Sequence, residues 1–496
     1  MKSIGYALAI FLPFLLASCT KTAENHLPAE SYIVENIVLP EGLEGETGAL
    51  AFLPDGRLVT CFLRGEVMIY DPKTEKWQLF ASGLHEPLGL YLFSESEMLV
   101  IQRPELTRLK DTDGDGRADL FETVTDDFGM TGNYHEWNYG PVKDAEGNLF
   151  ISLNTASEYG HVMKEVRGKL DTTLVPGNPK QKFSAVPYRG WVMKYTPEGK
   201  LIPYAYGFRS PSGLVIDPSG KLFVTDNQGD WVGTSTLYHV EEGKFYGHPA
   251  SLLWTEGWSR GDPSKLPVAE LDSMRTRASV LFPHGIMSSS PTQPVVDDTG
   301  GKFGPFGGQM FIGEMNQARI MRVMLEEVGG ALQGACLPFI DERNLLKGNN
   351  RLAFAPDGSL WVGHAAYHFA GDKGIQRIVF TGKQPMDIYS MNLTTKGFSL
   401  TFTQALNDSV AEDPTNYKMK RYYYDYHLKY GSDQYDVQEV SVGQATLSSE
   451  RTEVNLTLPE VKAGYIYELT LKNILSATGD TLTNTLICYT VNHLKE

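Results

Sequence analysis

The stretch LAFLPDGRLV at residues 50–59 decides the fold, because copies of it recur along the chain. It is typical of a strand, a turn with proline, aspartate and glycine, and a second strand of alternating apolar residues. The glycine supplies the positive φ that a tight hairpin turn needs. Close copies are PVKDAEGNLF at 141–150, VIDPSGKLFV at 215–224 and AFAPDGSLWV at 353–362, with weaker ones at 91–100 and 295–312.

Six such hairpins, spaced roughly 40 to 80 residues apart, predict radial repetition. No long helical periodicity competes with them, and a β-sandwich fits six similar hairpins less well. The sequence therefore predicts an all-β chain whose main domain is a six-bladed β-propeller over residues 35–382.

The pattern changes after this domain. Residues 381–385 are typical of a linker, and the alternating strands that follow predict a small immunoglobulin-like β-sandwich over 386–496. Between its strands lies RYYYDYHLKY at 421–430. Such an aromatic cluster either packs on a neighbouring domain or stacks on a sugar ring, and packing is the favoured interpretation.

The first residues have the features of a secretory signal: a basic start, a short apolar segment and small residues before a cut site. The sequence LASC at 16–19 resembles the bacterial lipobox, so residues 1–19 are interpreted as a lipoprotein signal peptide whose Cys19 carries lipid. A plain signal peptide is the alternative. Residues 20–34 would be a tether, and the protein would lie in the bacterial cell envelope, lipid-anchored on the periplasmic or cell-surface side.

Composition narrows the function classes. A net charge of −16 argues against a nucleic-acid partner. With four cysteines in 496 residues, the chain has neither a disulfide framework nor a Cys-x-x-Cys-His haem motif. Cys61, Cys336 and Cys488 lie in apolar runs and are expected in the core.

The segment DTDGDGRADLFE at 111–122 matches the twelve-residue calcium loop. It has oxygen ligands at positions 1, 3, 5, 9 and 12, glycine at position 6 and a backbone carbonyl at position 7. Because its flanks look like strands, the expected role is a structural Ca²⁺ site between blade strands. Its ligands would be Asp111, Asp113, Asp115, the Arg117 carbonyl, Asp119 and Glu122.

Further polar residues stand at the ends of the hairpins, which converge on one face of a propeller. A neutral histidine there, His135, is a candidate general base, with Glu136 beside it. Arg209 could bind a carboxylate or an oxyanion. The remaining candidates are Asp226, Asn227, Tyr246, His248, Arg319 and Arg351.

These segments resemble the glucose/sorbosone dehydrogenase family, six-bladed propellers that use pyrroloquinoline quinone (PQQ), over roughly 40–380. The resemblance rests on His135 ahead of the 143–150 hairpin, on RSPSGL at 209–214 and on GKFYGHP at 243–249. Two positions depart from the family pattern: Ser210 stands for asparagine and His248 for tryptophan. The chain is most similar to a secreted or membrane-attached, sorbosone-dehydrogenase-like branch with the same acidic loop and an immunoglobulin-like module.

The resemblance implies an extracytoplasmic oxidoreductase acting on a sugar or related alcohol or aldehyde. His135 would be the base, and Arg209 would bind the quinone oxygens. Tyr246, Arg319 and Arg351 would help to hold the cofactor, and Glu136, Asp226, Asn227 and His248 would contact a small sugar or glycan. Relatives in this branch often carry a cytochrome c domain; without one, electrons would leave to a separate acceptor.

Two alternatives of other classes remain. One is a propeller that binds carbohydrate or protein without catalysis. The other is a metal-assisted lyase or hydrolase built around His135 and Glu136. Fold alone does not separate them.

Overall fold

The computed structural model describes residues 30–157, 167–170, 181–367 and 371–496. The predicted signal peptide, Cys19 and most of the predicted tether lie outside these residues. Within them, no helix is both long and apolar enough to cross a membrane.

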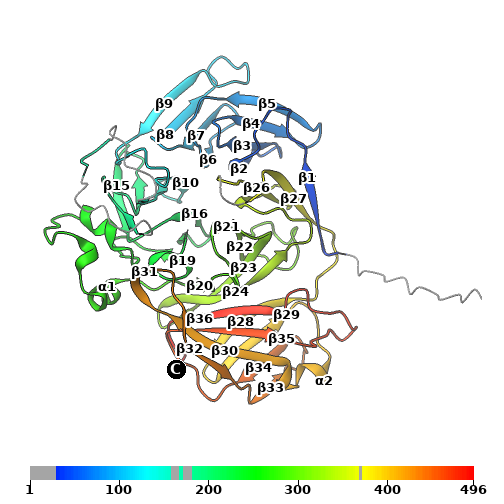
Figure 1. Ribbon diagram of the computed structural model, residues 1–496. Helices are drawn as coiled ribbons and strands as arrows, with labels where there is room; N and C mark the ends of the chain where they lie inside the picture. The colour runs from blue at the N-terminus through cyan, green and yellow to red at the C-terminus, as the bar shows by residue number, and fades with distance from the viewer. Residues whose placement is uncertain (1–29, 158–166, 171–180, 368–370) are drawn as a thin grey trace, which may run out of the picture.

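Six antiparallel sheets surround a common centre, which confirms the predicted six-bladed propeller (Figure 1). Each blade has four strands, which are named below in order from the centre outward. Blade 1 is β2 (Thr47–Phe52), β3 (Leu58–Phe62), β4 (Val67–Asp71) and β5 (Lys76–Ala81). Blade 2 is β6 (Gly89–Leu92), β7 (Glu97–Ile101), β8 (Leu106–Lys110) and β9 (Leu120–Thr125). Blade 3 is β10 (Asn138–Lys143), β11 (Leu149–Leu153), β14 (Trp191–Tyr195) and β15 (Leu201–Tyr206).

The other three blades continue around the ring. Blade 4 is β16 (Pro211–Ile216), β17 (Leu222–Asp226), β19 (Ser235–Val240) and β20 (Val280–Phe282). Blade 5 is β21 (Pro291–Val296), β22 (Met310–Glu314), β23 (Arg319–Val328) and β24 (Ala331–Asp341). Blade 6 is β25 (Asn349–Phe354), β26 (Leu360–His364), β27 (Gly374–Phe380) and β1 (Tyr32–Ile37).

The first described strand closes the ring. β1 pairs with β27 in antiparallel register from Tyr32↔Phe380 to Ile37↔Ile375, so the last blade takes its outermost strand from the start of the domain. Residues 32–34, which were expected to end the tether, therefore belong to the propeller. The ladder satisfies backbone groups that a free strand would leave to water.

The repeated hairpins account for the inner pair of strands in every blade. In the first, Leu53 N–H donates to the Arg57 carbonyl across a turn in which Gly56 has φ +93°. The matching glycines Gly147, Gly220 and Gly358 have φ between +86° and +92°. The predicted positive φ is confirmed, and a side chain at these positions would strain the turn.

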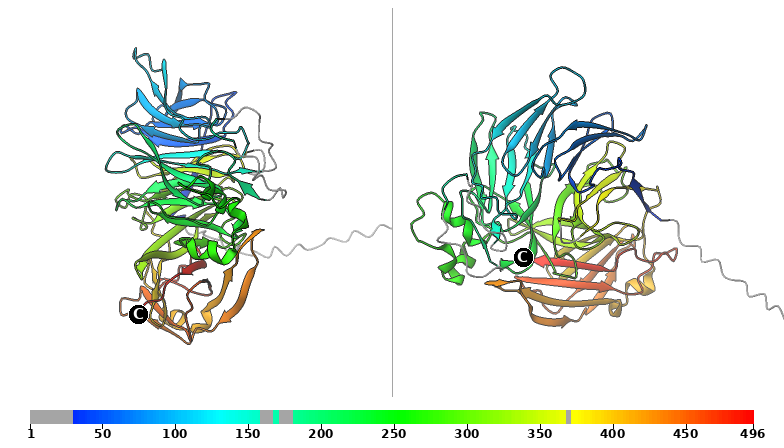
Figure 2. Two further views of the ribbon diagram at one scale, coloured as in Figure 1. Left: turned by 90° about the vertical axis from the view of Figure 1, so that its left-hand side faces the viewer. Right: turned by 45° about the horizontal axis from the view of Figure 1, so that its top comes forward.

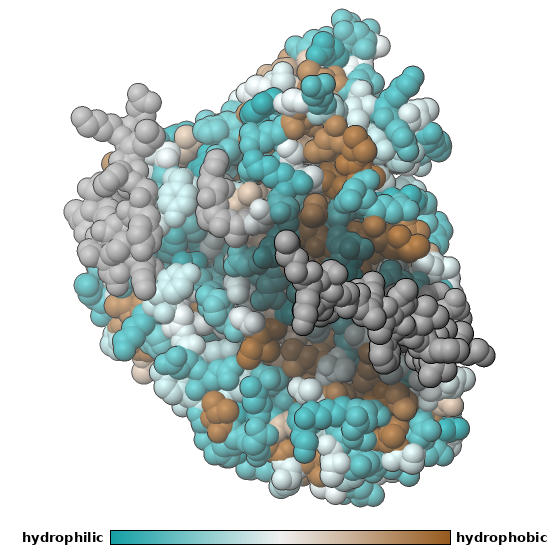
Figure 3. Space-filling model, turned by 45° about the vertical axis from the view of Figure 1, so that its right-hand side comes forward, coloured by the Kyte–Doolittle hydropathy of each residue, from teal (hydrophilic) through white to brown (hydrophobic). Residues whose placement is uncertain are grey.

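The core lies between the blades and, separately, inside the C-terminal domain. Cys61, Cys336 and Cys488 are buried and free, as predicted. Figure 3 shows one face of the molecule. Hydrophilic residues cover most of this face, and apolar residues form separate patches on it.

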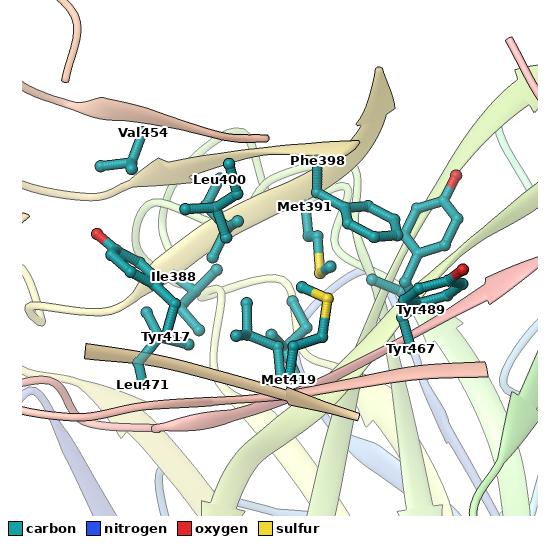
Figure 4. Packing of buried hydrophobic residues seen from close by; sticks show 14 of the residues in the cluster. Ile388, Met391, Phe398, Leu400, Tyr417, Met419, Val454, Tyr467, Leu471 and Tyr489 are labelled. Carbon is teal, nitrogen blue, oxygen red and sulfur yellow. The ribbon is translucent and has the colours of Figure 1, made fainter. Parts of the chain in front are cut away.

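The C-terminal domain is a sandwich of two sheets. One contains β28 (Ile388–Thr394), β29 (Gly397–Phe402), β34 (Glu453–Thr457) and β33 (Gln444–Leu447). The other contains β36 (Leu486–Val491), β35 (Tyr465–Leu471), β30 (Tyr417–Tyr424) and β32 (Gln434–Val440). Buried side chains such as Met391, Phe398 and Met419 fill the space between them (Figure 4). The predicted sandwich is present, and its immunoglobulin-like kinship stays a prediction.

Two strand pairings attach the sandwich to the propeller (Figures 1 and 2). β36 pairs with β24, so the second sheet continues blade 5. β31 (Tyr426–Tyr430) pairs with the short strand β18 (Asp230–Val232), which lies between β17 and β19 of blade 4. The short helices are α1 (Val268–Met274), α2 (Asp408–Ala411) and the 3₁₀ turns at Pro249–Trp254, Pro263–Lys265 and Pro414–Asn416.

Candidate functional site

A pocket of about 420 Å³ lies where the inner strands β10, β16 and β21 begin. Its walls come from the loops of blades 3, 4 and 5 and from the C-terminal sandwich. Its size falls in the range of about 300 to 1,000 Å³ that is usual for small-molecule sites. Its lining is Tyr134, His135, Trp137, Lys182, Arg209, Ser210, Asn227, Gln228, His284, Ser289, Ser290, Asn316 and Tyr430.

His135 is buried at the inner end of this pocket. Its Nδ1 lies 2.8 Å from the Thr155 carbonyl oxygen. Because a carbonyl only accepts, Nδ1–H is the donor, and neutral imidazole then carries a lone pair on Nε2. Nε2 meets the Ser210 hydroxyl at 3.4 Å. Burial, helped by Lys182 and Arg209, lowers the pKa of His135 well below its usual value. The ring is therefore a neutral base near pH 7.

Arg209 is anchored through its side-chain Nε and its backbone N–H. Its Nε donates to Asp230 Oδ1 at 3.0 Å, and its backbone N–H donates to Asp226 Oδ2 at 2.9 Å. Within the described residues, neither of its Nη groups has a protein acceptor within hydrogen-bond distance. A guanidinium fixed at Nε and unpaired at Nη is a ready donor for a carboxylate or an oxyanion.

Thr155 joins these two residues. Its carbonyl accepts from His135, while its N–H and its hydroxyl donate to the Arg209 carbonyl at 3.2 and 2.6 Å. One short segment after β11 thereby sets the spacing of the base and the cation. Sequence reasoning missed this residue because nothing local marks it.

Asp226 and Asp230 both accept hydrogen bonds from Arg209, but their pKa values shift in opposite directions. Burial raises the pKa of Asp226 to about 6, although the N–H groups of Arg209 and Ser210 oppose the shift. Burial also raises the pKa of Asp230, but His248 and Arg209 outweigh it and hold that pKa at about 2. His248 Nε2 lies 3.1 Å from Asp230 Oδ2. Asp226 and His248, predicted to contact substrate, instead lie behind Arg209 and do not line the pocket.

Lys182 supplies a second basic side chain that the sequence did not single out. It belongs to the small sheet of β12 (Ala156–Ser157) and β13 (Lys182–Phe183), and it lines the pocket. Burial, with Arg209 next, lowers its pKa well below the usual value for lysine. Within the part of the chain that the structure describes, its Nζ has no hydrogen-bond acceptor. A negative ligand group would offset both effects.

Asn227 is the predicted substrate contact that does line the pocket. Its Nδ2 donates to the Ser212 hydroxyl at 3.0 Å, and its Oδ1 is enclosed without a hydrogen-bond partner among the described residues. A buried acceptor without a donor costs free energy, which a ligand hydroxyl could recover.

Glu136 does not reach the pocket. Its carboxylate is buried, accepts the Thr131 N–H at 2.8 Å and lies 3.9 Å from Arg189. Glu136 follows a turn at Tyr134 and His135, and its carboxylate is used by the Thr131 N–H and by Arg189. No carboxylate lines the pocket within the described residues.

The other three predicted cofactor ligands are also elsewhere. Tyr246 is core: its hydroxyl donates to the His239 carbonyl and its ring stacks on Phe208. Arg319 forms a bidentate pair with Asp341 and caps two carbonyls. Arg351 lies in a separate cavity of about 40 Å³ on the propeller axis, which is too small for an organic cofactor.

The acidic loop lies between β8 and β9, as expected. One oxygen from each of Asp111, Asp113 and Asp115 lies within 4.8 Å of the others. Asp119 instead accepts from the Thr112 hydroxyl at 2.9 Å, and Glu122 pairs with Arg108 on the neighbouring strand at 3.1 Å. The predicted ligands at positions 9 and 12 are thus turned to protein partners, because strand pairing begins inside the loop motif.

Comparison with known proteins gives a family match and fold likenesses. The family described as Domain of unknown function (DUF7133) matches residues 68–364, more than half of the chain. No curated protein matches the chain.

Solved structures similar to the chain include three sugar dehydrogenases. The PQQ-bound aldose sugar dehydrogenase of Streptomyces coelicolor is 17% identical, with 71% of this chain and 99% of that chain covered and a TM-score of 0.45. The soluble aldose sugar dehydrogenase of Escherichia coli is 17% identical, covering 70% and 99%, with a TM-score of 0.47. The PQQ domain of pyranose dehydrogenase from Coprinopsis cinerea is 11% identical, covering 71% and 96%, with a TM-score of 0.46.

Proposed function

The chain belongs to the family described as Domain of unknown function (DUF7133), and from its pocket we propose that it is an oxidoreductase acting on a sugar or related alcohol or aldehyde. One observation carries the proposal. A neutral, buried histidine with a lone pair on Nε2 lines the same small pocket as an arginine whose two Nη groups have no acceptor among the described residues. This pairs a base with a binding site for negative charge, which hydroxyl oxidation needs.

His135 is the proposed base. The Thr155 carbonyl holds its ring in the tautomer that leaves Nε2 free to take a proton from a substrate hydroxyl. The lowered pKa keeps this nitrogen unprotonated at neutral pH. The Ser210 hydroxyl accepts a hydrogen bond from Asn154 Nδ2 at 3.3 Å. It can donate to Nε2 when that nitrogen is unprotonated and accept from it once it carries the proton.

The basic side chains of the pocket match the chemistry of PQQ, because that cofactor is a planar quinone bearing carboxylates. Arg209 and Lys182 are the residues that would hold it, with Nη and Nζ donors that the described protein leaves unused. When bound, the quinone supplies an acceptor for the hydride that leaves the substrate carbon. Arg319 and Arg351 are not part of this proposal: Arg319 pairs with Asp341, and Arg351 lies in an axial cavity that is too small for the cofactor.

The hydrolase alternative loses its main support. It requires a carboxylate beside His135 to hold a metal or activate water, whereas the Glu136 carboxylate lies against Arg189. The non-catalytic alternative predicts ligand binding without turnover and is separated by experiment.

We also propose that the acidic loop binds Ca²⁺ through Asp111, Asp113 and Asp115, with a structural role in blade 2. We further propose lipid attachment at Cys19, location in the cell envelope and electron transfer to a separate acceptor. Mass spectrometry of Cys19-containing peptides from the membrane fraction tests the lipid directly.

The test of the reaction is dye reduction by the purified full chain with PQQ, Ca²⁺ and a panel of neutral sugars. We expect sugar-dependent turnover that falls by about 100- to 10,000-fold in His135→Asn, the range for losing a general base. His493→Asn, an exposed histidine near the end of the chain, is the matched control and keeps full turnover. Binding without any turnover would establish the non-catalytic alternative instead.

A further inference from the structure

The C-terminal sandwich contributes directly to the pocket. β31 pairs with β18 so that Tyr430 lies opposite Asp230, the residue that anchors Arg209. Gly431 N–H donates to the Gly229 carbonyl at 2.9 Å, and the Tyr426 hydroxyl donates to the Gly247 carbonyl at 2.5 Å. A strand of one domain is therefore fixed to the loop that holds the proposed cation of the other.

Arg209 lies in a slot made from both domains. On one side is Gly229, where an added Cβ would stand 1.8 Å from Arg209 Nε, so a glycine is needed for the side chain to pass. The Tyr430 ring also lies against this side chain, with its centroid 5.3 Å from the guanidinium carbon. The ring face attracts the cation and limits its movement.

The local backbone is consistent with this docking. Trp231, next to Asp230, has φ +71°, a conformation that a bulky residue adopts only when its surroundings enforce it. Its buried ring packs 5.5 Å from Tyr426 on β31. The pairing thus sets the conformation of the segment that carries Asp230.

Simple packing does not account for Tyr430. Its side chain is 47% exposed, so it buries little apolar surface, and within the described residues its hydroxyl has no hydrogen-bond partner. Its contacts are the ring on Arg209 and the wall of the pocket.

We propose that Tyr430 is a positioning residue of the pocket: it holds Arg209 so that both Nη groups face an anionic ligand, and it makes the sandwich part of the binding site. The inference concerns the site of the proposed function, but it does not depend on the reaction. It applies to any carboxylate-bearing ligand that Arg209 binds.

The test measures Arg209 itself. The full chain is treated with p-hydroxyphenylglyoxal, which modifies arginines, and the labelling rate of the Arg209 peptide is followed by mass spectrometry. We expect Tyr430→Ala to raise this rate about fivefold, the factor for losing a cation–π contact of about 1 kcal/mol. Tyr430→Phe keeps the ring and stays within about twofold of wild type. Leu428→Ala, an exposed residue on the same strand, is the matched control and leaves the rate unchanged.

Equal labelling of wild type and Tyr430→Ala overturns the inference, as does a Tyr430→Phe variant that behaves like Tyr430→Ala. Titration with PQQ is the second readout, where Tyr430→Ala weakens binding about fivefold and Tyr430→Phe does not. If the wild type binds no PQQ, the proposed cofactor fails while the labelling result still decides the role of Tyr430. Thermal melting of each variant separates a loss of folding from a loss of positioning.

Discussion

The pocket and the axial cavity each hold a buried arginine, and the two arginines use their donors differently. Arg351, on the axis, donates from Nε to the Gly48 carbonyl and from Nη1 to the Ser212 and Asn350 carbonyls. It ties blades 1, 4 and 6 together, with Tyr139 against its guanidinium. Among the described residues, the Arg209 side chain donates from Nε alone. Burial and charge are thus shared. Arg351 is tied to three carbonyls and keeps only Nη2 without a partner, whereas neither Nη group of Arg209 has an acceptor among the described residues, which distinguishes a binding residue from a structural one.

The largest expected effect is on Arg209. Arg209→Gln removes the Nη donors and the charge, and we expect PQQ affinity to fall about 100-fold, the value of two charge-assisted hydrogen bonds. Stability changes little, because His248 still pairs with Asp230. Calorimetric titration and thermal melting measure the two quantities. A large loss of stability with unchanged affinity would reverse the assignment.

Arg351 should show the opposite behaviour. Arg351→Met leaves three backbone carbonyls without their donor, and we expect the free energy of unfolding to fall by about 2 to 3 kcal/mol. PQQ affinity should stay within about twofold of wild type, since the axial cavity is separate from the pocket. Denaturant unfolding provides the measurement, and loss of affinity in this variant would show that the two regions act as one.

The pH dependence of turnover tests whether His135 is the base. A base works when unprotonated, and burial lowers the pKa of His135 well below its usual value of about 6.5. Turnover should therefore stay level as pH falls through 6.5 and decline only at clearly lower pH. The same shift means that the unfolded chain binds the proton more readily, so this histidine reduces stability as pH falls below about 6.5. A rate profile whose acid limb lies at 6.5 or above would exclude a buried neutral base.

The smallest expected effect on the pocket comes from the acidic loop, which lies in blade 2 and contributes no residue to the pocket lining. Ca²⁺ at 100 times its dissociation constant should add about 2.7 kcal/mol of stability. Asp113→Asn, which removes one charge from the Asp111, Asp113 and Asp115 cluster, should reduce this gain. Melting curves with Ca²⁺ and with chelator measure the difference, and Mg²⁺ is the control ion. Identical melting curves with Ca²⁺ and with chelator would show that the loop does not bind calcium.

The propeller could be predicted because each hairpin is local: the turn glycine and the alternation of apolar residues lie within ten residues of one another. The position of His135 and Arg209 in one pocket could be predicted because both precede an inner strand. Arg351 could not be assigned in this way. Its acceptors Gly48 and Ser212 belong to other blades, so its role depends on how the ring closes.

Contacts between distant segments also explain the residues that sequence reasoning missed. Thr155 contacts His135 and Arg209 through two backbone hydrogen bonds, and a pattern of side chains in the sequence does not predict such bonds. Tyr430 lies in the tyrosine-rich stretch, where packing and ligand contact were both considered. Tyr426 packs on the propeller, as favoured, and Tyr430 lines the pocket, where contact with a ligand stays a prediction.

The most direct test of the central claim is a titration of the purified full chain with PQQ, followed by absorbance, for wild type, Arg209→Gln and Arg351→Met in parallel. We expect saturable binding by wild type, binding weakened about 100-fold in Arg209→Gln, and near-normal binding in Arg351→Met. Absence of binding by wild type, or equal affinity in wild type and Arg209→Gln, would contradict the proposal that this pocket is an anion-binding redox site.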